Sequence, residues 1–155
     1  MTMRDRVIAE AKTWKGTPFR DSARIKGVGV DCGQFLCAVY EAVGLAPAIE
    51  TRRYNLQFML NRSEEWYVET ILEYADEISA SEARMADVVV LKWGRVYSHG
   101  AILVDPWPGQ IWHALNGFGV GLCDAKRDGR IQAALQKNRA FPPRFFRARG
   151  IDSWV

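Results

Sequence analysis

Apolar residues in the first half of the chain recur at the spacing of an α-helix. One helix carries Val7, Ile8, Ala11 and Trp14 on a single face, and Gly16-Thr17-Pro18 ends it. A second runs through the apolar residues of 35–43 and ends at Gly44. A third begins at Ser63, followed by Glu64 and Glu65, and its stripe is Tyr67, Ile71 and Tyr74 or Ile78.

From Asp87 onward the apolar pattern is that of β-strands. The predicted strands are residues 88–91, 101–104, 110–115 and 120–123, and Asn116-Gly117 joins the last two. Asp105-Pro106-Trp107-Pro108-Gly109 is a turn signal between the second and third. A short helix at 131–136 and a strand at 144–149 follow. Helices therefore come first and an antiparallel sheet second, which predicts an α+β domain.

Length and composition predict one folded domain. A chain of 155 residues, 48% hydrophobic and 25% charged, can bury a core of its own, so residues 1–155 form a single domain. Three cysteines, at positions 32, 37 and 123, cannot build a disulfide framework. Their odd number indicates a reducing compartment or a reactive thiol.

The net charge of +3 is unevenly distributed. Residues 63–82 hold seven Asp or Glu and no base, whereas residues 124–150 hold eight Lys or Arg against two Asp. Charged runs usually form solvent-exposed faces. The alternative interpretation of the basic run is that it contacts a polyanion or an acidic partner. No nucleic-acid-binding motif accompanies it. The role of the basic segment 124–155 stays unassigned.

The N-terminal residues resemble no secretory signal, because charges interrupt the first dozen positions and no apolar core follows. The longest uncharged stretch, 106–123, contains Pro, Gly, His, Asn and Gln, so no membrane insertion is expected. We expect synthesis in the cytoplasm.

Cys32 is the candidate nucleophile, because it opens the second predicted helix directly after a glycine-spaced loop. Backbone N–H groups at a helix N-terminus stabilise an anion, which would lower the pKa of the thiol. Asp31 can cap the same helix end, and Gly33 leaves the sulfur uncrowded. An isolated cysteine is more often a small core residue, and Cys37, about 140° further round the helix, fits that description.

The two histidines of the chain both lie in the predicted sheet. His99 opens one strand and His113 lies in the next, and adjacent antiparallel strands can place such side chains on one face. One imidazole could then act as a base toward a thiol while the other fixes its tautomer and orientation.

Together these residues resemble the NlpC-type cysteine peptidases of peptidoglycan, a papain-like family in which a nucleophile helix packs on an antiparallel sheet. The matching segments are Gly16-Thr17-Pro18-Phe19, Val30-Asp31-Cys32-Gly33, Ala86-Asp87-Val88-Val89, His99-Gly100-Ala101-Ile102 and Trp112-His113-Ala114. Residues 26–32, KGVGVDC, resemble the phage-encoded branch associated with tail tips. That branch implies phage tail proteins as partners and a virion-associated or cell-wall location.

The resemblance implies a role for each site residue. Cys32 would attack an amide carbonyl, His99 would exchange the proton, and His113 would hold the His99 ring. The backbone N–H of Cys32 would contribute to an oxyanion hole, with no metal or cofactor required. The substrate implied is the stem peptide of peptidoglycan.

Two departures from the family pattern affect the site. Phe19 stands where the family usually has Tyr, so a hydroxyl near the thiol is lost or supplied by another residue. Gly33 and Gln34 replace the Ser and Gly that commonly follow the nucleophile. Trp93, Trp107 and Trp112 are close to the histidines in the sequence, and large aromatic residues usually pack the sheet rather than line a substrate groove. Trp107, between two prolines in a turn, is the candidate for an exposed substrate contact.

Three other functions stay open. Cys32, His99 and His113 could bind zinc, although no C-x-x-C pair accompanies them. The chain could be an inactive papain-like structural or binding component. It could also be a thiol amidase or acyltransferase that acts on another substrate.

Overall fold

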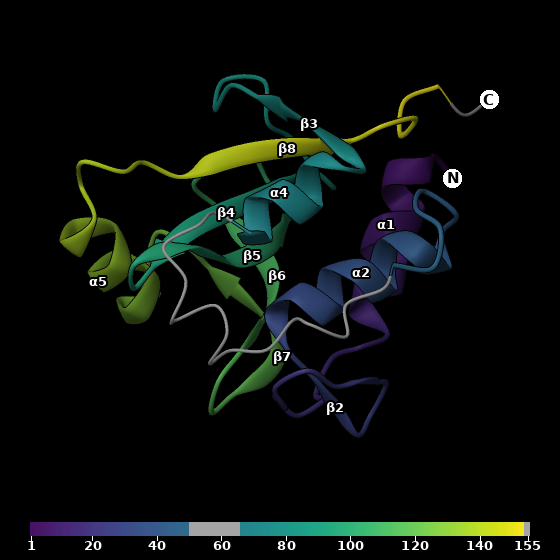
Figure 1. Ribbon diagram of the computed structural model, residues 1–155, viewed down its shortest axis with the longest axis horizontal. Helices are drawn as coiled ribbons and strands as arrows, with labels where there is room; N and C mark the ends of the chain where they lie inside the picture. The colour runs from purple at the N-terminus through teal and green to yellow at the C-terminus, as the bar shows by residue number, and fades with distance from the viewer. Residues whose placement is uncertain (50–65, 154–155) are drawn as a thin grey trace.

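The computed structural model describes residues 1–49 and 66–153 and has the predicted α+β class (Figure 1). The helices are α1 (Met3–Lys12), α2 (Cys32–Ala42), α4 (Trp66–Leu72) and α5 (Gly129–Lys137). The strands are β1 (Arg24–Ile25), β2 (Gly29–Val30), β3 (Ala75–Ile78), β4 (Val88–Trp93), β5 (Val96–Leu103), β6 (Gln110–Leu115), β7 (Gly119–Asp124) and β8 (Arg144–Ala148). No helix of the described residues is both long and apolar enough to span a membrane.

An antiparallel sheet forms the centre of the described residues, with the strand order β3-β8-β4-β5-β6-β7. The helices α1 and α2 lie together on one side of it, while α5 lies at the opposite end of the molecule (Figure 1). One core cluster joins α1, α2 and α4 to the sheet through Val88, Val90 and Ile102. A second covers the other face, where Ile131 of α5 packs with Leu91 and its neighbours. The central strands β4, β5 and β6 are therefore largely buried on both faces.

The predicted first helix is confirmed, but α1 ends at Lys12, so Trp14 lies in the turn between the helix and Gly16. Thr2 and Asp5 form a capping box at the start of α1, which satisfies backbone N–H groups that have no partner inside the helix. Gly16 adopts a φ of +85°, a conformation that favours glycine. The segment that follows binds β7, because Gly16 N donates to Val120 O at 3.0 Å and Val120 N donates to Thr17 O at 2.9 Å.

The third predicted helix is shorter than its apolar stripe indicated. Its predicted start, Ser63 to Glu65, lies outside the described residues, and α4 ends at Leu72. The Arg149 guanidinium donates to the carbonyl oxygens of Leu72 and Glu73, at 2.8 and 2.7 Å, which are acceptors at the end of the helix. Beyond it, residues 75–78 pair with β8, so including Tyr74 or Ile78 in a helix was wrong. Pairing with a strand from the far end of the chain overrides the local pattern.

The acidic and basic runs meet in the fold. Strands β3 and β8 are neighbours, and they join Glu77 to Arg144 at 2.6 Å and Asp76 to Arg149 at 3.0 Å. Part of both runs is therefore paired within the protein. These two pairs use two of the seven acidic residues of 63–82 and two of the eight basic residues of 124–150.

A buried carboxylate connects the first helix to the last strand. Asp87 has no exposed surface and accepts from Arg4 of α1 at 3.0 Å and from Arg147 of β8 at 2.9 Å. The oxygen that accepts from Arg147, Oδ2, also accepts the Arg84 N–H at 3.0 Å. The Ala86-Asp87 segment therefore has a structural function, since it holds α1 and β8 on β4.

Candidate active site

Cys32 is the first residue of α2, at the helix end that stabilises negative charge. Asp31 is the N-cap, and its carboxylate accepts the N–H of Gln34 at 2.8 Å and that of Ser22 at 2.7 Å. Burial raises the pKa of Asp31 to about 6, although these hydrogen bonds oppose the shift. Asp31 therefore fixes the helix start and ties it to the preceding loop.

The Cys32 thiol reaches the main chain of β5 beside His99. Its Sγ lies 3.3 Å from the carbonyl oxygen of Ser98, to which the thiol donates. The paired residues of β5 and β6 are Ile102 with Trp112 and Leu103 with Ile111, so Ser98 lies beyond the end of that ladder. The nucleophile helix thus delivers its sulfur to β5 where the two strands no longer pair.

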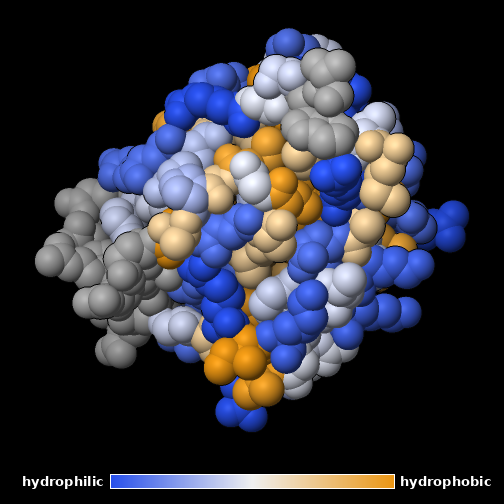
Figure 2. Space-filling model, turned by 90° about the vertical axis from the view of Figure 1, so that its right-hand side faces the viewer, coloured by the Kyte–Doolittle hydropathy of each residue, from blue (hydrophilic) through white to orange (hydrophobic). Residues whose placement is uncertain are grey.

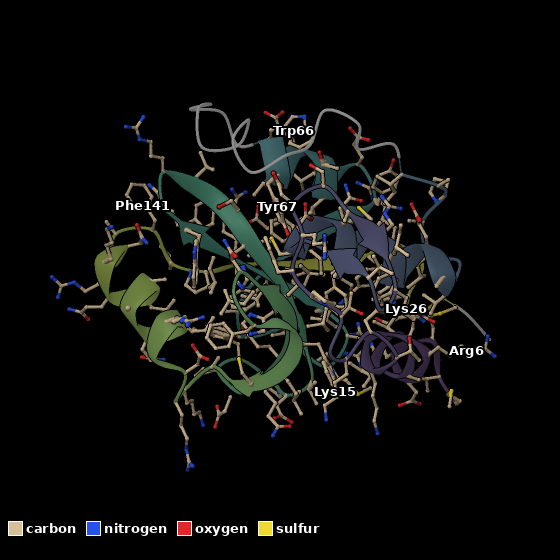
Figure 3. The ribbon with its side chains drawn as sticks, turned by 90° about the horizontal axis from the view of Figure 1, so that it is seen from below. Arg6, Lys15, Lys26, Trp66, Tyr67 and Phe141 are labelled. Atoms are coloured by element: carbon tan, nitrogen blue, oxygen red, sulfur yellow. The ribbon has the colours of Figure 1, made fainter. Side chains whose placement is uncertain are left out.

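Tyr67 of α4 supplies a hydroxyl to the same sulfur. Its Oη donates to Cys32 Sγ at 3.8 Å, and the side chain is buried. Burial, reinforced by the neighbouring Cys32, raises the pKa of Tyr67 well above its ordinary value, so the hydroxyl keeps its proton. Figure 3 shows Tyr67 toward the interior of the molecule, whereas Trp66 lies nearer its edge.

His99 and His113 contact each other on one face of the sheet. Their Nε2 and Nδ1 atoms are 2.9 Å apart, and the rings meet nearly edge to face, at 75°. Continuing the register of β5 and β6 places His113 opposite Ala101, so the two histidines are diagonal neighbours. Because His99 uses Nε2 for His113, Nδ1 is the ring nitrogen left for a thiol.

On the next strand, β7, Cys123 is the diagonal neighbour of His113. His113 Nε2 lies 3.3 Å from the Sγ of Cys123, which faces Ile111 in the β6–β7 register. In the sequence, Cys123 stands out only as one of an odd number of cysteines. A two-residue turn at Asn116-Gly117 would place His113 opposite Val120. The loop has three residues, 116–118, so His113 lies opposite Gly121 and Cys123 becomes its diagonal neighbour.

Burial keeps both imidazoles neutral. It lowers the pKa of His99 to about 3, with a smaller contribution from His113. It also lowers the pKa of His113, against the opposing charge of Asp128. Near neutral pH, each ring therefore carries one proton and one lone pair, which is the state a general base needs.

Trp93, at the end of β4, covers the His99 ring. The ring centroids are 4.7 Å apart and the planes are tilted by 38°. The Ser98 hydroxyl donates to the Trp93 carbonyl at 3.0 Å, which ties the two strands together next to the histidine. This indole contributes to the low-polarity surroundings of His99.

Gly33, Gln34 and Phe19 occupy different places around the helix start. Gly33 lines an apolar cavity of about 80 Å³, together with Cys37 and Tyr67. Gln34 is buried and accepts from Arg24 Nε at 2.7 Å, so its amide supports β1. Phe19 is half-buried, and its backbone forms a bridge with Val30, two residues before Cys32.

The β1–β2 hairpin adds an exposed apolar tip near the helix start. Its residues Ile25 and Val28 are 59% and 53% exposed. The side of the molecule shown in Figure 2 has hydrophobic side chains at its bottom, which is the height of the β1–β2 hairpin in Figure 1.

Trp107 does not lie with the other site residues. Its ring is half-buried and packs edge to face on Phe145, with 6.1 Å between centroids, in the second core cluster. Trp107 belongs to the turn that follows β5. The last residue of β5, Leu103, is four residues from His99, which corresponds to roughly 13 Å of strand. Packing on Phe145 gives the indole a structural function, and a substrate contact at Trp107 stays a prediction.

Within residues 1–49 and 66–153, no three His, Cys, Asp or Glu side chains are arranged to hold a metal ion. The zinc alternative therefore has no site among the described residues.

Comparisons with known proteins establish the fold. No family model matches the sequence, and no curated protein matches it. The chain is similar to the NlpC/p60 domain of the peptidoglycan hydrolase SagA, with a TM-score of 0.56 and 20% identity over 92% of this chain and 96% of that chain. It is also similar to a lipoprotein-like protein of the NLP/P60 family from Staphylococcus aureus subsp. aureus Mu50, with a TM-score of 0.59 and 20% identity. That match covers 92% of this chain and 40% of the other. The predicted NlpC-type, papain-like fold is thus confirmed.

Proposed function

We propose that the chain is an NlpC-type cysteine peptidase that hydrolyses an amide bond in the stem peptide of peptidoglycan. The observation that carries the proposal is the His99–His113 pair, 2.9 Å apart, beside the carbonyl that binds the Cys32 thiol. The fold supports the same activity, because one structural neighbour is described as a peptidoglycan hydrolase.

In the first half of the reaction, His99 Nδ1 takes the proton of the Cys32 thiol. The sulfur then forms a bond with the carbonyl carbon of the amide, and the carbonyl oxygen becomes an oxyanion. The backbone N–H of Cys32 is proposed as one donor to that oxygen, because it points out of the first turn of α2. His99 next gives its proton to the leaving amine, and a thioester remains.

Water completes the cycle. His99 Nδ1 takes a proton from the attacking water, and the thioester carbon–sulfur bond breaks to release the carboxyl product. The proton returns to the Cys32 sulfur. His113 keeps the same position throughout, since its Nδ1 contacts His99 Nε2 and leaves the other ring nitrogen for the reaction.

Tyr67 is proposed to take the part of the hydroxyl that Phe19 lacks. A donor directed at the sulfur favours the thiolate over the thiol, as a hydrogen bond to any charged form does. The distance of 3.8 Å between Tyr67 Oη and Cys32 Sγ is long, which suits a hydroxyl that moves closer when the sulfur becomes charged.

We further propose that the enzyme is encoded by a phage or prophage and acts on the cell wall in association with tail proteins. The support is the KGVGVDC segment, residues 26–32, which resembles that branch of the family. The exposed Val28 belongs to that segment, and the exposed Ile25 directly precedes it.

Mass spectrometry of peptidoglycan tests the proposal. Whole sacculi and isolated stem peptides are incubated with wild type, with Cys32→Ala and with Cys37→Ala as the matched cysteine control. New free amines within the stem peptide are expected with wild type and Cys37→Ala but not with Cys32→Ala. That pattern identifies the reaction, the nucleophile and the cleaved bond.

Alkylation separates the ways in which this test can fail. Burial raises the pKa of Cys37 and of Cys123 to about 12, so iodoacetamide near neutral pH is expected to label Cys32 first. A folded protein with a reactive Cys32 that cleaves neither substrate would indicate an amide of another kind. A folded protein with neither cleavage nor labelling would favour an inactive structural component.

A further inference from the structure

Three side chains on neighbouring strands form a continuous hydrogen-bonded line. His99 on β5 contacts His113 on β6 at 2.9 Å, and His113 Nε2 contacts the Cys123 sulfur on β7 at 3.3 Å. His99 and His113 are buried, and Cys123 is half-buried. Neither the resemblance nor the comparisons give Cys123 any role.

The positions of the protons along this line follow from the chemistry required of His99. This step rests on the proposed function, in which His99 Nδ1 accepts the proton of Cys32. A neutral imidazole has one N–H, so the His99 proton must be on Nε2, where it is donated to His113 Nδ1. The proton of neutral His113 must then be on Nε2, which faces Cys123.

We propose that Cys123 is a positioning residue that accepts the His113 Nε2–H and so keeps both histidines in the tautomer that catalysis needs. A cysteine sulfur can accept or donate a hydrogen bond. If the Cys123 thiol donated instead, His113 would be protonated on Nδ1 and His99 would accept through Nε2. The His99 proton would then be on Nδ1, and the ring could not receive the proton of Cys32.

The charges around Cys123 fit this assignment. Asp128 caps α5 with Oδ1, which accepts the N–H groups of Arg130 and Ile131, both at 3.0 Å. Burial first, then Asp128 and Asp124, raise the pKa of Cys123 to about 12. The sulfur therefore remains a neutral thiol, and a nearby negative charge attracts its proton and leaves a lone pair for His113.

Nuclear magnetic resonance of the imidazole nitrogens tests the assignment directly. The chain has only two histidines, so ¹⁵N-histidine labelling gives the signals of only these two rings. In the wild type and in Cys123→Ser, which retains an acceptor, both rings are expected to carry their proton on Nε2. A proton on Nδ1 of His113 in the wild type would overturn the proposal.

The rate of Cys32 alkylation provides the functional readout, measured by peptide mapping with iodoacetamide. Cys123→Ala is expected to slow labelling of Cys32 by about 2- to 12-fold, the equivalent of one lost neutral hydrogen bond. Cys123→Ser should stay within about 2-fold of the wild type, and Cys37→Ala should not change the rate. Equal losses in Cys123→Ala and Cys123→Ser would indicate packing alone and would contradict the proposal.

Neither measurement needs a substrate. If peptidoglycan is not cleaved but the tautomers and labelling rates are as expected, the proposed substrate fails and the role of Cys123 stands. If cleavage occurs and Cys123→Ala labels at the wild-type rate, the role of Cys123 fails alone.

Discussion

Gly100 and Tyr67 are fitted to each other: a Cβ atom at Gly100 would overlap the hydroxyl oxygen of Tyr67. The same atom would lie 2.6 Å from Leu36 Cδ1 on α2. Strand β5 therefore approaches both α2 and α4 at this position, where it has no side chain. The absence of that side chain lets the Tyr67 hydroxyl reach the Cys32 sulfur.

Replacing Gly100 with alanine is expected to destabilise the fold by about 1–3 kcal/mol, the usual cost of an overpacked core. Gly121→Ala is the matched control on β7, because a Cβ there meets no atom within 4 Å. Urea denaturation measures both variants. Adding Tyr67→Phe to Gly100→Ala should recover part of the loss, and no recovery would mean that the clash with Leu36 dominates.

Removing the Tyr67 hydroxyl should affect the thiol more than the fold. In Tyr67→Phe the Cys32 thiolate loses a hydrogen-bond donor, so its alkylation near neutral pH should slow by about 2- to 12-fold. Tyr40→Phe is the control, because Tyr40 is also buried but donates to Ala86 O at 2.7 Å. That variant should lose stability while the alkylation rate of Cys32 stays unchanged. Equal rates in both variants would remove Tyr67 from the site.

The buried carboxylate of Asp87 should matter far more than exposed ion pairs. Asp87→Asn removes the charge that Arg147 pairs with and leaves Arg4 paired with Asp152 alone, which is expected to cost about 3–5 kcal/mol of the free energy of unfolding. Glu77→Gln breaks the partly exposed pair with Arg144 and should cost less than about 1 kcal/mol. Chemical denaturation of the two variants gives the comparison, and similar losses would contradict it.

Stability should fall as the pH is lowered through the range in which the unfolded chain protonates its histidines. Burial lowers the pKa of His99 from 6.5 to about 3, so between these values the unfolded chain binds a proton that the native state does not. His99 therefore contributes stability above about pH 6.5 that is lost progressively toward pH 3. Urea midpoints at pH 7.5 and pH 5 should differ less in His99→Gln than in the wild type. The same difference in both proteins would argue against a buried neutral His99.

Asp31 should oppose this trend. Its pKa is raised from 3.8 to about 6, so the native state binds the extra proton within that range and stability falls as the pH rises through it. Asp31→Asn removes this contribution, and the loss of stability on acidification should then become steeper. A shallower loss would mean that the cap hydrogen bonds outweigh burial and keep the pKa low.

The parts of the fold that local sequence specifies could be predicted. The helix that starts at Cys32 was found because a capping Asp31, a glycine-spaced loop and an apolar stripe agree. Strands β6 and β7 were found because Asn116-Gly117 sets their turn, and the His99–His113 contact follows from placing both residues on adjacent strands.

The features that were missed depend on contacts between distant parts of the chain. The sequence around Leu72 and β3 has no local signal strong enough to end a helix there. The helix ends because β3 pairs with β8 and because Arg149 donates to the Leu72 carbonyl oxygen. Tyr67 was assigned to an apolar stripe, and only the fold shows that its hydroxyl reaches Cys32 across Gly100. Trp107 has the sequence setting of an exposed turn residue, but a partner 38 positions later, Phe145, covers it.

Strand β8 inserts between β3 and β4, although both of those strands precede it in the chain. During synthesis, β4 therefore has an open edge and β3 has no partner until residues 144–148 are available. An open edge of this kind invites pairing with other chains. Completion of the sheet is consequently among the last events in the production of the protein, and the nascent chain is most vulnerable to aggregation just before β8 inserts.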